Sequence, residues 1–352
     1  MTVKLHLKAV YRQKKTFLEG EQCVILIAAT ETEGMRMKIL VLGGSYFLGR
    51  VFVMQAAAEH EITVVNRGSY SMAEFGVKEL RGDRSSEDFL KECREDYDVL
   101  VDFNAYQPGD IQKVLRNLER SPKQYIFIST ADVYRRGTGD VKTEDTPFET
   151  RMFPGEAGNY IAGKVALEGE LRKECTGRGI AYTVLRPVLI YGPYNYAPRE
   201  SLFIQIMVQN HILPEITDAS GRFQMVYVKD AAEAVLKCLL NEKAFGQAYN
   251  ISGDEILDYH TFAEGLGWAA ETEAKGTTVE EAVSDAAHSV SVKTVPFTVE
   301  AFTSQGLELP FPVTEAESEL YSNEKSRREL GMVYTEFTEG IRRTYRAFRS
   351  VF

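Results

Sequence analysis

Short apolar runs alternate with helix-length segments through the middle of the chain. The first run, Lys38–Leu42, is continuous enough for a strand that is buried on both faces. Glycines follow it, then a helical stretch over Phe47–Glu59 and a second apolar run over Ile62–Val65. Strand, helix and strand in this order predict a βαβ unit.

Three further strand-like runs are separated by helix-length segments: Val99–Val101, Tyr125–Ile128 and Tyr182–Leu185. Alternation of this kind predicts an α/β fold with a doubly wound parallel sheet. In open sheets of this kind ligands bind at the carboxyl ends of the strands. The residues that follow each run are therefore the candidates for a binding site.

The regular pattern loosens after Pro187, where Pro and Gly become more frequent. We expect a sheet domain over residues 37–186, to which residues 226–251 return, and a smaller α+β part made of residues 187–225 and 252–352. Residues 1–36 are an extension outside this pattern. They could add a hairpin, but we favour a functional start at Met35 or Met37, because the codons for Glu33-Gly34 would resemble a ribosome-binding site.

Composition places the chain among ordinary globular proteins, since 44% of its 352 residues are hydrophobic and 26% are charged. No apolar run approaches the roughly 20 residues that span a bilayer. The net charge of −10 disfavours nucleic acid and anionic lipid as partners. The four cysteines and five histidines show neither disulfide nor metal-ligand spacing, so we expect a cytoplasmic protein without a metal site.

A glycine-containing loop joins the first strand to the first helix. It consists of Gly43, Gly44, Ser45, Tyr46, Phe47, Leu48 and Gly49. The backbone N–H groups of such a loop and the helix N-terminus can receive a pyrophosphate, although a tight turn also uses glycine for steric reasons alone. Because the second strand ends about twenty residues later, where a dinucleotide ribose would lie, the loop predicts a dinucleotide cofactor.

The end of the second strand carries Asn66 and Arg67 in place of the acidic residue that binds the ribose hydroxyls of NAD. Arginine suits a 2′-phosphate, so NADP is slightly favoured over NAD, unless Arg67 is only a solvated charge. Asp83 is placed to accept a hydrogen bond from the adenine amino group, or it is a simple turn residue. Solvated faces are expected for Arg84 and for four arginines of the last helix, Arg342, Arg343, Arg346 and Arg349.

Tyr160 and Lys164 lie four residues apart in a helical segment and therefore on one face. A nearby cation lowers the pKa of a tyrosine hydroxyl, so that Tyr160 could exchange a proton near neutrality. The same spacing occurs twice more, at Tyr11/Lys15 and Tyr321/Lys325. Only the middle pair lies between strand ends, and Ser129 and Thr130 follow one of those strands. We expect this pair and one of the two hydroxyls to share a site.

Four motifs together resemble the extended short-chain dehydrogenase/reductases, which form the NAD-dependent epimerase/dehydratase family. They are Gly43–Gly49, Ser129–Tyr134, Tyr160–Lys164 and Leu185–Pro193. The similarity covers about residues 37–350. It implies a Rossmann-like dinucleotide-binding domain over residues 37–186, a substrate-binding remainder, and NAD or NADP as cofactor.

The resemblance also implies roles for single residues. Tyr160 would be the acid/base, and Lys164 would hold the nicotinamide ribose and tune the tyrosine. Thr130 would be the hydroxyl partner, with Ser129 as the less favoured alternative. The glycine loop would hold the pyrophosphate, and Pro187 would lie at the nicotinamide. Substrate contacts are expected from Ser129, Tyr191, Asn195, Arg199 and Arg222.

Two positions depart from the family pattern. Tyr46 replaces the central glycine of the loop, as in the subgroup that contains chloroplast stem-loop RNA-binding proteins. Ala131 and Asp132 replace the Asp-Glu pair of family dehydratases, which makes a dehydratase the weaker option. We expect an NAD(P)-dependent epimerase or reductase that acts on a nucleotide-linked sugar or a similar hydroxyl or ketone. The alternative is a nucleotide-binding but non-catalytic RNA-binding or regulatory protein, and we allow for a homodimer.

Overall fold

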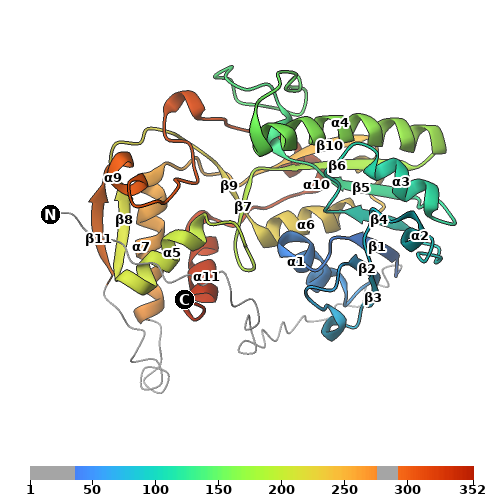
Figure 1. The fold of residues 1–352 in the computed structure, drawn as a ribbon, viewed down its shortest axis with the longest axis horizontal. Coiled ribbons are helices and arrows are strands. Elements are labelled where there is room, and N and C mark those ends of the chain that lie inside the picture. Colours follow the sequence, from blue (N-terminus) through green and yellow to red (C-terminus); the bar gives the residue numbers. More distant parts are fainter. Residues whose placement is uncertain (1–35, 276–291) are drawn as a thin grey trace.

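The computed structural model describes residues 36–275 and 292–352 (Figure 1). The predicted N-terminal extension, its proposed start at Met35 and the Tyr11/Lys15 pair lie outside the described residues. The centre of the fold is a parallel sheet of seven strands in the order β10-β6-β5-β4-β1-β2-β3. The strands are β1 (Lys38–Leu42), β2 (Glu61–Asn66), β3 (Lys78–Arg81), β4 (Val99–Asp102), β5 (Gln124–Ile128), β6 (Ala181–Pro187) and β10 (Gln247–Ile251).

The continuous apolar runs form strands because both faces of this sheet are covered by helices. In β1, Ile39 and Val41 pack into one core and Leu40 and Leu42 into the other, and all four side chains are fully buried. Helices α1 (Phe47–Ala56) and α6 (Val228–Cys238) cover the first face. The opposite face is covered by α2 (Glu87–Leu90), α3 (Asp110–Asn117) and α4 (Gly155–Arg178). The predicted doubly wound α/β fold is confirmed.

The second part of the molecule lies beside the sheet, on the left in Figure 1. Its helices are α5 (Glu200–Asn210), α7 (Tyr259–Lys275), α9 (Val299–Thr303) and α11 (Phe337–Arg349), whereas α10 (Glu324–Leu330) packs on β10 and α6 at the sheet. Two small parallel sheets complete it, one formed by β8 (Ile212–Ile216) with β11 (Lys293–Phe297) and the other by β7 (Leu189–Tyr191) with β9 (Met225–Tyr227). Short 3-10 turns are η2 (Ala73–Phe75), η3 (Ala131–Val133), η4 (Glu242–Ala244) and η5 (Glu315–Glu317).

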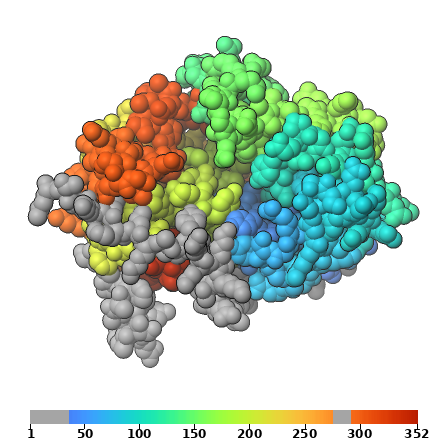
Figure 2. All heavy atoms as spheres, viewed as in Figure 1, coloured from blue at the N-terminus to red at the C-terminus, as the bar shows by residue number. Residues whose placement is uncertain are grey.

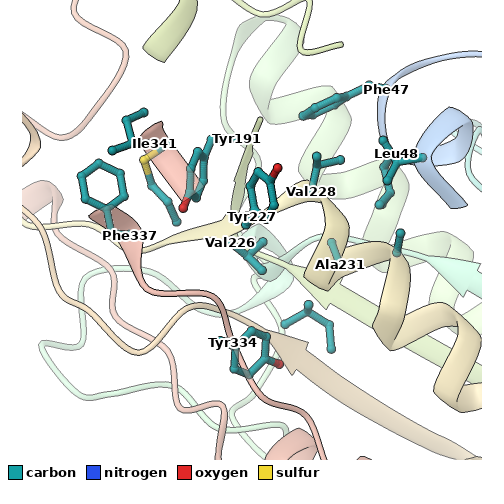
Figure 3. Close-up of a cluster of buried hydrophobic side chains, with 14 of the residues drawn as sticks. Phe47, Leu48, Tyr191, Val226, Tyr227, Val228, Ala231, Tyr334, Phe337 and Ile341 are labelled. Atoms are coloured by element: carbon teal, nitrogen blue, oxygen red, sulfur yellow. The ribbon is translucent and has the colours of Figure 1, made fainter. Parts of the chain in front are cut away.

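One hydrophobic core runs through both parts. It extends from Phe47 and Leu48 of α1, through Val226 and the start of α6, to Phe337 and Ile341 of α11 (Figure 3). Residues 226–251 supply both α6, which packs on α1, and β10, which pairs with β6. Because the core is continuous, the loops at the carboxyl ends of the sheet are held in fixed positions against the second part.

Candidate functional site

A cavity of about 1490 Å³ lies at the carboxyl ends of the sheet strands. Its wall combines the loops that follow β1 to β6 with residues of the second part, including Phe223 and Phe311. In the view of Figure 2 the blue and cyan atoms of the sheet domain lie beside the orange atoms of the second part, with yellow-green atoms of the intervening segment between them. The cavity therefore occupies the position where open α/β sheets bind ligands.

Six of the seven residues of the glycine loop line this cavity, and Gly44 is the exception. A Cβ on Gly44 would lie 2.8 Å from Cγ1 of Val41, so this glycine allows α1 to pack closely on the sheet. Gly43 adopts a φ of +88°, and a Cβ on Gly49 would lie 2.3 Å from the Gly43 carbonyl oxygen. In the described structure no side chain caps the N-terminus of α1, whose dipole favours an anion there.

Tyr46, the residue in place of the central glycine, belongs to an aromatic cluster at this loop. Its ring centroid lies 5.1 Å from that of Tyr70, in the loop after β2, and 5.1 Å from that of Tyr196, in the segment after β7. The Tyr196 ring also meets the Phe47 ring edge-on at 6.3 Å. The large side chain at this position thus ties the loop to two other segments of the cavity wall.

The end of β2 is shaped by Asn66, whose side chain is buried. Its Oδ1 accepts a 2.6 Å hydrogen bond from the Gly68 N–H, and its Nδ2 donates to Oε1 of Glu79 at 3.2 Å. Arg67 is exposed and lines the cavity. Asp83 also lines the cavity, and its Oδ1 accepts hydrogen bonds from the backbone and side chain of Ser85. The structure brings all three predicted residues to this wall.

Lys164 is buried on the inward face of α4, one turn after Tyr160. Its Nζ donates to the carbonyl oxygens of Ile128, the last residue of β5, at 2.8 Å and of Ala105, in the loop after β4, at 3.0 Å. Burial lowers the pKa of Lys164 to about 8, although the carboxylate of Asp102 opposes this shift. Lys164 thus links α4 to two strand ends and places a titratable amine in the cavity wall.

Tyr160 and Thr130 line the same wall, and the Thr130 hydroxyl donates to Oδ2 of Asp132 at 3.2 Å. Burial, followed by the charge of Asp132, raises the pKa of Tyr160 above the usual tyrosine value, and the Thr130 hydroxyl opposes the rise. Lys164 Nζ lies 5.8 Å from the ring centroid of Tyr160 and donates to carbonyl groups instead. The predicted lowering of the Tyr160 pKa is therefore not what this geometry produces.

Ser129 lines the cavity but uses its hydroxyl within the protein. Its Oγ donates to Oε1 of Glu168 at 2.6 Å, and the same carboxylate is held by the Arg186 guanidinium at 3.0 and 2.6 Å. Arg186 in turn donates to the hydroxyl of Tyr134. This buried network leaves Thr130, not Ser129, as the hydroxyl beside Tyr160. Pro187, at the end of β6, also lines the cavity.

Of the remaining predicted substrate residues, only Arg199 reaches the cavity. Tyr191 is fully buried in the core of Figure 3, where its ring lies 5.6 Å from the rings of both Tyr227 and Phe337. Asn195 donates to the buried carboxylate of Glu200, and Arg222 forms an exposed ion pair with Glu315. These three side chains therefore serve packing and local structure in the described molecule.

Two cationic residues of the cavity wall were not predicted as site residues from the sequence. Arg84, expected on a solvated face, is largely enclosed, with its Nη1 2.5 Å from Oδ1 of Asp102 and 2.7 Å from Oδ1 of Asn104. Arg136 pairs with Asp132 at 2.9 Å. Asp102, directly after the apolar run of β4, was the signal that could have revealed Arg84. It is fully buried, and a buried carboxylate requires a partner.

The other features noted in the sequence have structural roles. Tyr321 lines the cavity, but Nζ of Lys325 donates to Gln247, so these two groups do not form a second Tyr–Lys site. Arg342 and Arg346 of α11 both bind the carboxylate of Glu273. Across residues 36–275 and 292–352, no cluster of three or more metal-ligating side chains occurs. No helix in the same ranges is long and apolar enough to cross a bilayer.

Comparison with known proteins identifies relatives of this fold. A family model described as the NAD dependent epimerase/dehydratase family matches residues 39–252. The chain is 29% identical over 283 residues to the chloroplast stem-loop binding protein of 41 kDa b of Arabidopsis thaliana, covering 74% of this chain and 68% of that protein. It is 24% identical over 253 residues to a dTDP-glucose 4,6-dehydratase of Mycobacterium tuberculosis, covering 63% of this chain and 74% of the relative.

Solved structures share the fold at lower identity. An epimerase from Methanothermobacter thermautotrophicus superposes with a TM-score of 0.67 at 16% identity, covering 90% of this chain and 93% of that chain. The UDP-glucose 4-epimerase of Thermus thermophilus, solved in complex with NAD, gives 0.63 at 20% identity, covering 89% and 99% of the two chains.

Proposed function

The chain belongs to the NAD-dependent epimerase/dehydratase family, and from this premise we propose that it is an NAD(P)-dependent epimerase or reductase of nucleotide-linked sugars. One observation carries the proposal: the glycine loop and the side chains of Thr130, Tyr160 and Lys164 line the same cavity. A nicotinamide cofactor and a substrate with a hydroxyl or ketone group, both bound in this cavity, would contact the same wall. Nucleotide sugars are named as substrates of the dehydratase relative and of the epimerase neighbours.

The residues of the loop fit a dinucleotide. Gly43 and Gly49 allow the tight strand-to-helix turn, because a Cβ on either would meet protein atoms, and the uncapped N-terminus of α1 supplies positive potential for a diphosphate. Arg67 and Asp83 would meet the adenosine half, Pro187 the nicotinamide and Lys164 its ribose. When bound, the nicotinamide supplies a hydride acceptor or donor.

Tyr160 would move the proton that accompanies hydride transfer. Its raised pKa keeps the phenol protonated near neutral pH, so the described geometry favours proton donation to a ketone oxygen. The opposite direction requires a phenolate, and Lys164, whose Nζ lies 5.8 Å from the Tyr160 ring centroid, is our candidate for the cation that would favour it once a ligand is bound. Thr130, on the same cavity wall as Tyr160, would orient the same substrate oxygen.

The segment after Thr130 favours epimerase or reductase chemistry over dehydration. Elimination of water needs an acid for the leaving hydroxyl and a base for the adjacent carbon. Ala131 has no ionisable group, and Asp132 is held by the Arg136 guanidinium at 2.9 Å and by Thr130 at 3.2 Å. A second acid from this turn is therefore missing.

The similarity to a stem-loop binding protein favours a second function, nucleotide-dependent RNA binding without catalysis. The net charge of −10 and the pairing of Arg342 and Arg346 with Glu273 oppose it, because these arginines are already neutralised. We therefore keep RNA binding as an outcome of the test.

A screen of UDP- and dTDP-linked sugars with added NAD or NADP tests the proposal. We expect mass spectrometry to show one sugar converted to an epimer, or reduced or oxidised with matching change in the nicotinamide. If no nicotinamide-dependent conversion occurs and the protein binds a stem-loop RNA tightly, the enzyme proposal is rejected in favour of RNA binding. Mass spectrometry of the nucleotide that copurifies with the chain identifies the cofactor independently.

A further inference from the structure

The ion pair between Arg84 and Asp102 has no part in the reaction proposed above. Asp102 is the last residue of β4 and is fully buried, and Arg84 lies in the loop after β3, largely enclosed in the cavity wall. Strands β3 and β4 do not pair with each other in the sheet. Because the desolvation of two charges is costly, a pair of this kind adds little net stability. Its surroundings indicate a different role.

The Arg84 guanidinium braces the loop that follows β4. Its Nη1, which pairs with Asp102 at 2.5 Å, also donates to Oδ1 of Asn104 at 2.7 Å. Its Nη2 donates to the carbonyl oxygen of Asp110, the first residue of α3, at 3.3 Å. The Asn104 N–H donates in turn to Oδ1 of Asp102 at 3.0 Å. These bonds hold the loop at both of its ends.

The same loop contacts both Lys164 and the glycine loop. The Ala105 carbonyl oxygen accepts a hydrogen bond from Lys164 Nζ at 3.0 Å. A Cβ on Gly43 would lie 3.1 Å from Cβ of Asn104, so Asn104 packs directly on the strand-to-helix turn. The pair of Arg84 and Asp102 therefore sets the position of Lys164 relative to that turn.

Asp102 keeps its charge in this buried position. Burial alone would raise the pKa of Asp102, but the charge and the hydrogen bond of Arg84 hold it below the usual aspartate value. The Tyr125 hydroxyl, which donates to Oδ2 of Asp102 at 2.6 Å, acts in the same direction. At neutral pH the end of β4 therefore carries a fixed negative charge.

This charge acts on Lys164. The charged and titratable groups that face the lysine come from its own helix, from α3 and from the loops: Tyr160, Glu168, Asp110, Tyr106, Arg84 and Asp102. Burial lowers the pKa of Lys164 to about 8, and the Asp102 carboxylate opposes this shift more strongly than any other charge. Arg84 lowers the pKa further, but its effect is smaller than that of Asp102. Because Asp102 and Lys164 are both buried, water screens their attraction only weakly.

We propose that Asp102 is a positioning residue for Lys164, which keeps this lysine an ammonium and, through Arg84, fixes the loop to which the lysine donates. The proposal rests on the function proposed above, in which Lys164 acts as a cation beside Tyr160. It adds a second requirement to the Tyr160–Lys164 spacing, namely a buried carboxylate at the end of β4.

The pKa of Lys164 in Asp102→Asn tests the proposal without any assay of activity. The readout is NMR of the full chain labelled isotopically at lysine Cε, and the Lys164 signal is identified by its absence in Lys164→Arg. We expect the pKa of Lys164 to fall by roughly one pH unit, because the Arg84 charge remains while its counter-charge is removed. Asp98→Asn breaks the pair with Lys123 just before the same strand and is the matched control, in which Lys164 should titrate as in wild type.

The double variant Arg84→Gln/Asp102→Asn covers the case in which the unpaired Arg84 charge prevents Asp102→Asn from folding. Both charges of the pair are absent from it, so the pKa of Lys164 should again fall below the wild-type value, but by less than in Asp102→Asn. An unchanged Lys164 pKa in the folded variants overturns the proposal, even if their unfolding temperature falls, because Asp102 would then serve only the fold. An equal fall in Asp98→Asn also overturns it. Failure of the enzyme function is recognised separately, as the absence of nicotinamide-dependent conversion of any sugar by the wild type.

Discussion

Arg67 stands at the end of β2 with an exposed guanidinium on the cavity wall. Asn66 beside it is neutral, and the nearby Glu79 carboxylate is engaged by Asn66, Ser71 and Arg81. We predict that NADPH binds more tightly than NADH. Arg67→Ala should weaken NADPH binding by about 1.5–3 kcal/mol and leave NADH nearly unchanged, as titration calorimetry can measure. Equal affinities of the wild type for the two cofactors would contradict this assignment.

The depressed pKa of Lys164 predicts a pH dependence of stability. Burial lowers the pKa from 10.5 to about 8, so between these values the unfolded chain binds a proton that the folded chain does not. Stability therefore rises with pH across this range, by up to about 3 kcal/mol from this group. Urea unfolding of wild type and Lys164→Met should show the wild type gaining stability relative to the variant from about pH 8 to about pH 10. A stability difference between wild type and variant that does not change with pH would contradict this prediction, because it would mean that the folded-state pKa of Lys164 is not lowered.

The sequence predicted which residues line the cavity more reliably than it predicted which side chains contact one another. The side chains of Thr130, Tyr160 and Lys164 line one cavity because strand ends and a helical i, i+4 spacing are local properties. Arg84 was misplaced because its partner, Asp102, comes from β4, a strand that does not pair with β3 and lies eighteen residues later in the chain. Tyr191 was expected at the substrate, but its partners Tyr227 and Phe337 are distant in sequence, so no local pattern shows that it is buried.

Helix α4 is joined to strand β6 by the buried pair of Glu168 and Arg186. Glu168→Ala would leave the Arg186 charge buried without a carboxylate, and we predict a loss of about 3–5 kcal/mol in the free energy of unfolding. Asp96→Ala is the matched control, because it breaks the exposed pair with Arg120 and should cost no more than about 1 kcal/mol. Chemical denaturation measures both. Similar losses in the two variants would refute the structural role of the buried pair.

The elements of the sheet were predictable and those of the second part were not. Strands β1 and β5 are buried on both faces, so their apolar runs are continuous and short. Strand β11, by contrast, has one buried residue in Lys293–Phe297 and contains a proline. It pairs with β8, about eighty residues earlier. Neither periodicity nor composition marks such a strand, since its partner is set by the tertiary fold.

At the scale of the whole molecule, the continuous core holds the sheet domain and the second part in one arrangement around the cavity. The cofactor side of the cavity is formed by loops of the sheet, and the remaining wall includes Phe223, Phe311 and Tyr321. A ligand that touches both sides stabilises the whole fold. We expect substrate choice to depend on this second wall, for which the sequence has no recognisable pattern.

Tyr160→Phe tests the central claim most directly, because it removes the hydroxyl and keeps the ring. The measurement is the rate of nicotinamide-dependent conversion of the sugar found in the screen, with NADH affinity measured alongside. The account predicts that the rate falls by about 10²–10⁴-fold while NADH affinity is nearly unchanged. Tyr106→Phe, at a second cavity tyrosine whose ring lies 6.3 Å from that of Tyr160, is the control and should stay close to wild type. A Tyr160→Phe variant as active as wild type would contradict the account.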